Sequence, residues 1–149
     1  MTELNKYLGL VICLILVLIT TTIGYFFPAL DLLALPLSII GISLIINFLT
    51  VKFHPICQTV LTFCFISIND IGIKLFSGAT HDLEGQGLIN LSLLIGLIPA
   101  IGIFITFIIK RKDYPILIRI ISICLMIGLL YLHFHFFDWL GVDSRYLKK

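Results

Sequence analysis

Long apolar runs recur along this chain, and they constrain its fold more than any other feature. Four of them, residues 7–27, 32–51, 88–109 and 116–137, hold about 20 residues each. At a rise of about 1.5 Å per residue, a helix of that length crosses the roughly 30 Å of hydrocarbon in a bilayer. Helices also satisfy every backbone polar group inside lipid. The sequence therefore predicts an all-α integral membrane protein, folded as a polytopic helical bundle.

A fifth apolar run is ambiguous because polar residues interrupt it. Residues 55–68, PICQTVLTFCFISI, would form a helix of about 21 Å, which is too short to span a bilayer. Extended to residue 76, the run includes Asn69, Asp70 and Lys74 and reaches about 33 Å. Its first half is apolar around the whole helix, which favours burial over a position in the interface plane. We therefore predict five transmembrane helices, and the alternative is four helices plus a re-entrant segment. The predicted spans are residues 7–27, 32–51, 55–76, 88–109 and 116–137.

Composition and charge agree with a single membrane domain over residues 1–149. Hydrophobic residues make up 60% of the chain, and charged residues make up 12%. The net charge of +2 is small and its residues are scattered, so no nucleic-acid partner is expected. The four cysteines lie inside apolar runs without a C-x-x-C motif and are expected to pack as small apolar residues.

The distribution of basic residues predicts the orientation. Counts of Lys and Arg on the two sides are the same for four and for five spans, so the count does not decide between them. The dense KRKD sequence at residues 110–113 separates two strong apolar runs, and such clusters mark the cytoplasmic side. We expect a multi-pass protein of the plasma (inner) membrane with its N-terminus in the cytoplasm, and the first run is expected to be retained as a span.

The polar residues of the ambiguous run form a candidate functional cluster. Asp70 and Lys74 stand four residues apart with the acid first, which is the spacing of a helical ion pair. One interpretation is a self-neutralised helix end whose lysine reaches toward headgroups. The other is that Asp70 and Asn69 point into the bundle and bind a proton, a cation or a partner's polar group, because an ionisable residue within a span is a functional candidate.

The following loop, SGATHDLEGQG at residues 77–87, adds His81, Asp82 and Glu84 to this candidate cluster. These side chains could act as ligands or proton carriers on a glycine-rich backbone. No H-E-x-x-H motif or comparable spacing accompanies them, so no metal and no cofactor are predicted. The sequence YLHFHFFDW near the end of the fifth run is typical of an aromatic belt, in which His133 and His135 would be interfacial anchors.

Small residues on the fourth run predict helix packing. Ser92, Gly96 and Ala100 recur every four residues and would let another helix approach closely. In the second run, Ser43 and Asn47 share one face, and Asn47 is expected to bond to a neighbouring helix.

These patterns contain no catalytic motif and leave little mass outside the membrane. They favour a non-catalytic membrane subunit or accessory protein whose partners are other membrane proteins, in a homo- or hetero-oligomer, and membrane lipid. One alternative is a small ion- or proton-coupled transporter using Asp70. Another is an interfacial membrane enzyme with an outer-face site formed by His81, Asp82, Glu84 and Asp70 as acid/base or metal-binding groups, although an enzyme is not the favoured class.

Overall fold

The structure is a computed structural model that describes residues 3–77, 83–140 and 142. Within these residues every regular element is a helix: α1 Glu3–Phe26, η1 Pro28–Leu30, α2 Asp31–Leu49, α3 Pro55–Phe76, α4 Leu83–Lys110 and α5 Ile116–Phe137. Five of the helices are long and apolar enough to cross a membrane. The predicted multi-pass helical bundle with five spans is therefore confirmed.

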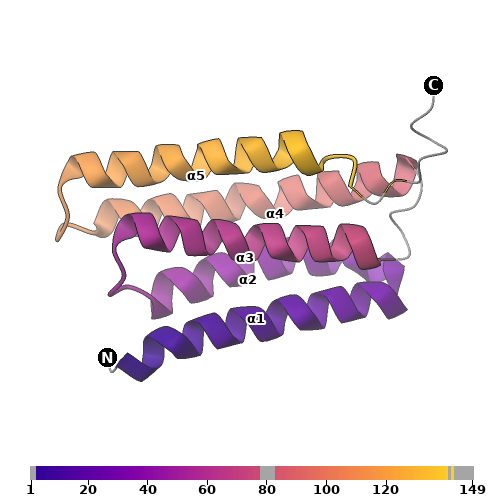
Figure 1. The fold of residues 1–149 in the computed structure, drawn as a ribbon, viewed down its shortest axis with the longest axis horizontal. Coiled ribbons are helices and arrows are strands. Elements are labelled where there is room, and N and C mark those ends of the chain that lie inside the picture. The colour runs from indigo at the N-terminus through magenta and orange to yellow at the C-terminus, as the bar shows by residue number, and fades with distance from the viewer. Residues whose placement is uncertain (1–2, 78–82, 141, 143–149) are drawn as a thin grey trace.

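The five helices run alternately in opposite directions, so the bundle has two ends (Figure 1). We name them by their charge. At the acidic end, where α1, α3 and α5 finish and α2 and α4 begin, the charged residues of the described chain are Asp31, Asp70, Lys74, Glu84 and Asp138. Around the loops of the basic end they are Lys52, Lys110, Arg111, Lys112, Asp113 and Arg119.

Two helices have the bounds that the sequence predicts, because prolines mark their starts. Pro55 is the first residue of α3, and Pro115 immediately precedes α5. Proline fixes a helical φ and has no N–H to leave unpaired in a first turn. At the start of α3 the His54 side chain also accepts a hydrogen bond of 3.3 Å from the backbone N–H of Ile56.

The start of α4 differs from the prediction. The helix begins at Leu83 rather than at residue 88, so the expectation that residues 83–87 belong to a loop is wrong. The reason is a tertiary contact, since the buried Gln86 donates a hydrogen bond of 2.6 Å from Nε2 to the carbonyl of Asp138. That bond holds the first turn of α4 against the end of α5, although this turn contains Gly85 and Gly87.

The most extensive helix contact joins α2 and α4, and we call it the α2–α4 seam. Pro36 lies inside α2 and has no N–H, so the carbonyl of Leu32 lacks its helical partner. Ser92 of α4 supplies one, because its hydroxyl donates to that carbonyl at 2.6 Å. One turn on, a Cβ at Gly96 would lie only 2.7 Å from the Pro36 Cα, so the absent side chain permits this close approach.

Apolar side chains fill the interior and also cover the outside of the bundle. The core runs along α2, α3 and α4 and includes fully buried Leu35, Ile66 and Phe104. On the surface, Ile98, Tyr131 and Phe136 are each at least 70% exposed. An apolar surface all around a helical bundle is suited to hydrocarbon rather than to water.

Candidate functional site

Three ionisable side chains meet inside the bundle between α3 and α5. Oδ2 of Asp70 lies 2.8 Å from Nζ of Lys74 and 2.8 Å from Nε2 of His133. Asp70 and Lys74 are fully buried, and His133 is 3% exposed. We call these three residues the charged cluster. Asp70 lies six residues before the end of α3, about 9 Å along the helix axis, and Lys74 lies two residues before that end.

Backbone at the end of α5 completes the cluster. The last carbonyls of a helix have no partner within that helix. Nζ of Lys74 donates to the carbonyl of Phe137 at 3.1 Å, so this lysine bonds inward. The expectation that Lys74 reaches toward headgroups is therefore wrong: the Asp70 carboxylate and the free helix end attract the ammonium more strongly than distant water.

Neighbouring amides extend this polar layer to α4. Nδ2 of Asn90 donates to Oδ1 of Asp138 at 2.5 Å and to its carbonyl at 3.1 Å. Together with Gln86, Asn90 ties the start of α4 to the chain just beyond α5. The acidic end is thus joined across α3, α4 and α5 by polar side chains.

On its other side α3 makes neutral hydrogen bonds through Asn69. Its Oδ1 accepts from the hydroxyl of Thr20 in α1 at 2.5 Å, and its Nδ2 donates to the hydroxyl of Ser38 in α2 at 2.8 Å. Ser38 in turn donates to the carbonyl of Leu35. Two adjacent residues of α3 therefore contact different helices. Asn69 contacts α1 and α2 through neutral groups, and Asp70 contacts α5 through ionisable groups.

One ring nitrogen of His133 has no partner within the part of the chain that the structure describes. An ionised Asp70 balances the charge of Lys74, and its Oδ2 lies within hydrogen-bond distance of Nε2 of His133. The second ring nitrogen, Nδ1, is buried and has no hydrogen-bond partner among the described residues, and neither has Oδ1 of Asp70. His133 therefore contributes one ring nitrogen to the charged cluster and leaves the other unbonded.

The structure separates the residues of the predicted cluster. Asn69, Asp70 and Lys74 all point into the bundle. Glu84 is exposed in the first turn of α4 and is not part of the charged cluster. His81 and Asp82 lie outside the described residues. Among the residues that are described, no three His, Cys, Asp or Glu side chains gather as they would around a metal ion.

His133 is the site residue that sequence reasoning missed, because the aromatic belt around it favoured an interfacial anchor. The structure corrects that interpretation for His133, which is buried against Asp70, while His135 is exposed. Two residues on a helix are about 200° apart, so one of the two histidines had to face inward. A buried Asp70 in need of a partner was the signal that could have selected it.

At the basic end a second polar group holds the loop between α4 and α5. Nη1 of the largely buried Arg111 donates to Oε1 of Gln58 at 3.2 Å, and its Nη2 donates to the carbonyl of Phe53 at 3.1 Å. Arg111 also hydrogen-bonds to Asp113, which lowers the pKa of that exposed carboxyl. Arg111 therefore links the α4–α5 loop to α3 and to Phe53 before it, in addition to contributing to the basic charge of this end.

The predicted packing residues lie within the bundle. Ser92 and Gly96 form the seam described above, and the carbonyl of Ala100 accepts from the hydroxyl of Ser43 at 2.9 Å. Asn47 donates to the Ser43 carbonyl of its own helix at 2.7 Å, so the expectation that its side chain bonds a neighbouring helix is wrong. The stripe on α4 therefore faces α2 of this same chain.

No family model, curated protein or solved structure matches the chain. Its class follows from the fold alone, which is that of a multi-pass helical membrane protein. Its particular feature is the charged cluster between α3 and α5.

Proposed function

We propose that this protein is a small proton-translocating permease in which Asp70 and His133 bind the proton. One observation carries the proposal: a carboxylate, an imidazole and an ammonium share a single buried contact within a membrane span. Charges inside a bilayer are costly, and where they are kept they commonly mark proton or ion pathways. Imidazole is also the side chain whose protonation changes near neutral pH.

The roles of the three residues follow from their contacts. His133 takes the proton at Nδ1, the ring nitrogen without a partner. Asp70 holds the ring through Nε2 and stabilises the imidazolium. Lys74 balances the carboxylate when the ring is neutral, so the cluster alternates between net charges of zero and +1.

The uneven distribution of charged residues between the two ends of the bundle supports one orientation in the membrane. Most basic residues near the helix ends lie at the basic end, and most acidic ones at the acidic end. Basic loops stay in the cytoplasm. We therefore place the basic end and the N-terminus in the cytoplasm of a plasma (inner) membrane. The charged cluster then lies toward the outer face, and protons would enter from that side.

Proton flux into vesicles tests this function. Purified protein is reconstituted into liposomes that contain a pH-sensitive dye, and an inward proton gradient is imposed. We expect the wild-type protein to dissipate the gradient at least several-fold faster than empty vesicles, and we expect His133→Gln to abolish that increase. His135→Gln is the matched control, because this exposed histidine lies two residues away and does not contact Asp70.

A charge-neutral variant separates function from folding. Asp70→Asn alone would leave the Lys74 ammonium buried without its carboxylate, so Asp70→Asn/Lys74→Gln is the better test. We expect this double variant to fold and to show no proton flux. Equal flux through the wild-type protein, His133→Gln and the double variant would contradict the proposal.

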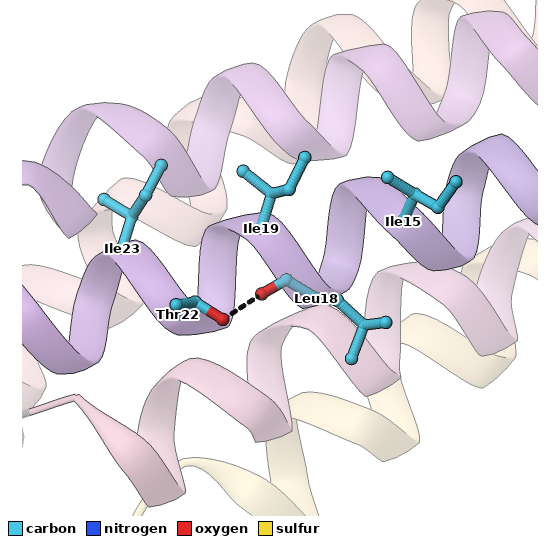
Figure 2. A pocket seen from close by; sticks show the side chains of 5 residues that line it. All are labelled: Ile15, Leu18, Ile19, Thr22 and Ile23. Carbon is cyan, nitrogen blue, oxygen red and sulfur yellow. Dashed lines mark hydrogen bonds between the residues drawn. The ribbon is translucent and has the colours of Figure 1, made fainter.

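A groove on α1 favours a second candidate function, that of a subunit in a larger membrane assembly. Figure 2 shows the groove, and its lining is almost entirely apolar: Ile15, Leu18, Ile19, Thr22 and Ile23. Thr22 donates its hydroxyl to the Leu18 carbonyl at 2.7 Å, which leaves an aliphatic face for a partner's transmembrane helix.

Isolation in mild detergent at native expression tests this second candidate. A membrane-protein partner should co-purify with the wild-type chain and be lost on Ile19→Trp, which fills the groove. Ile98→Trp on the exposed face of α4 is the control. A chain that purifies alone and monomeric would contradict a role as a subunit.

A further inference from the structure

We propose that Asp31 forms a monovalent-cation site, for Na⁺ or an ion of similar chemistry, where α1, α2 and α3 meet at the acidic end. Asp31 is the first residue of α2, and its side chain is fully buried. Among the described residues, neither carboxylate oxygen has a hydrogen-bond partner of good geometry. A buried carboxylate without donors is strongly disfavoured, so the folded state must either protonate it or hold a cation beside it, and the oxygen ligands around Asp31 favour the cation.

The usual explanation for an acid in this position does not apply. An acidic residue in the first turn of a helix normally accepts hydrogen bonds from free backbone N–H groups. The start of α2 has no such side-chain cap. In the charged cluster, Lys74 and His133 pair with Asp70, and neither forms a hydrogen bond with Asp31.

The surroundings of Asp31 supply oxygen ligands and negative potential. Gly24 of α1 packs directly on the carboxylate, and a Cβ there would overlap both of its oxygens. Because α1 ends two residues later at Phe26, the negative end of its dipole and its last carbonyls lie at the same junction. The hydroxyl of Ser77, at the end of α3, also approaches the carboxylate without full hydrogen-bond geometry. Carboxylate, hydroxyl and carbonyl oxygens are the ligands that hard cations prefer.

The single negative charge of the Asp31 site favours a monovalent over a divalent cation. Asp31 contributes one negative charge to a site that is otherwise built from neutral oxygens. One monovalent cation neutralises it, whereas a divalent ion would leave a net charge buried in an apolar bundle. Gly24 is needed because its missing side chain leaves the space in which the carboxylate sits.

Thermal unfolding in two salts tests the site. The melting temperature of the detergent-solubilised full chain is measured in NaCl and in N-methyl-D-glucamine chloride at equal ionic strength. We expect Na⁺ to raise the melting temperature of the wild-type protein with saturation, because a ligand that binds the folded state stabilises it by mass action. We expect Asp31→Asn to remove the Na⁺ effect and Asp113→Asn, which changes an exposed carboxylate at the basic end, to retain it.

A second variant pair tests the geometry without changing charge. Gly24→Ala should abolish or strongly weaken the Na⁺ effect, while Gly102→Ala, whose added Cβ would meet no atom within 4 Å, should leave it unchanged. Broadening of the ²³Na resonance by the wild-type protein, and its loss in Asp31→Asn, gives an independent readout. A wild-type melting temperature that does not respond to Na⁺, or a response equal in Asp31→Asn, would overturn the proposal and identify Asp31 as a neutral acid. Either result leaves the proton-flux test of the charged cluster unaffected.

Discussion

The α2–α4 seam and the charged cluster join helices of the same bundle by opposite means. In the seam, hydroxyls donate to backbone carbonyls and a glycine lets the helices touch, so all the groups are neutral. Between α3 and α5, three ionisable side chains share one contact. The stability of the seam depends on shape, whereas that of the cluster depends on charge balance. Only the cluster contains ionisable side chains.

The largest expected effect comes from breaking the charge balance of the cluster. Lys74→Met leaves Asp70 buried without its cation, and we expect it to lower the free energy of unfolding by about 3–5 kcal/mol. Reversible unfolding by SDS in mixed micelles, followed by circular dichroism, measures the change. Asp70→Asn/Lys74→Met removes both charges and should recover most of the loss. A single variant as stable as the wild-type protein would show that the ion pair is not desolvated.

The next largest effect should come from the close approach in the seam. Gly96→Ala places a Cβ 2.7 Å from the Cα of Pro36, so α2 and α4 must move apart. We expect a loss of about 1–3 kcal/mol, typical of overpacking, in the same unfolding assay. Gly102→Ala on the same helix meets no atom and should be neutral or slightly stabilising. Equal effects of the two substitutions would mean that the seam is not tightly packed.

A smaller effect is expected from the hydrogen bond that Pro36 makes necessary. Ser92→Ala leaves the Leu32 carbonyl without a donor and should cost about 0.6 kcal/mol, the average for side-chain hydrogen bonds between membrane helices, and no more than about 1.7 kcal/mol. Thr106→Val is the control, because Thr106 is exposed and donates only within its own helix. The cost of Ser92→Ala should shrink in a Pro36→Ala background, where a restored N–H can take the carbonyl, and an undiminished cost would contradict this explanation.

The smallest effect should come from the ion pair at the basic end between the largely buried Arg111 and the exposed Asp113. Arg111 lowers the pKa of Asp113 below its ordinary value of 3.8, so ionised Asp113 favours the folded state. This contribution is fully present above about pH 4, where the unfolded carboxyl is also ionised, and is lost as the pH falls through the lowered folded-state pKa. We expect Asp113→Asn to change the melting temperature slightly at pH 7 and not at all at the acid limit. A change as large as that of Lys74→Met would show that exposure does not weaken this pair.

Sequence reasoning identified the elements because apolar length is a local signal. The structure adds a reason for the starts of α3 and α5, which coincide with Pro55 and Pro115. The start of α4 was misplaced because the contact of Gln86 with Asp138 joins residues far apart in the chain and outweighs two local glycines. Local propensity is weak where such contacts act.

The candidate site was predictable only in part for the same reason. Asp70 was found because a charge inside an apolar run needs a partner, and Lys74 because it lies one helical turn away. His133 is 63 residues from Asp70, and only the fold brings them together. The orphaned carboxylate of Asp31 is likewise a tertiary property, since nothing in its sequence neighbourhood shows that Gly24 covers it.

Pro36 has a consequence for how related sequences can vary. Its missing N–H leaves the Leu32 carbonyl without a helical donor, which Ser92 supplies, and its backbone lies in the space that Gly96 leaves. Positions 36 and 92 should therefore change together, because a sequence with an ordinary residue at position 36 no longer needs a hydroxyl at position 92. Position 96 should stay small whatever residue stands at position 36, because the close contact is with the backbone there. Such joint substitutions would record in natural variation the helix contact seen in this one molecule.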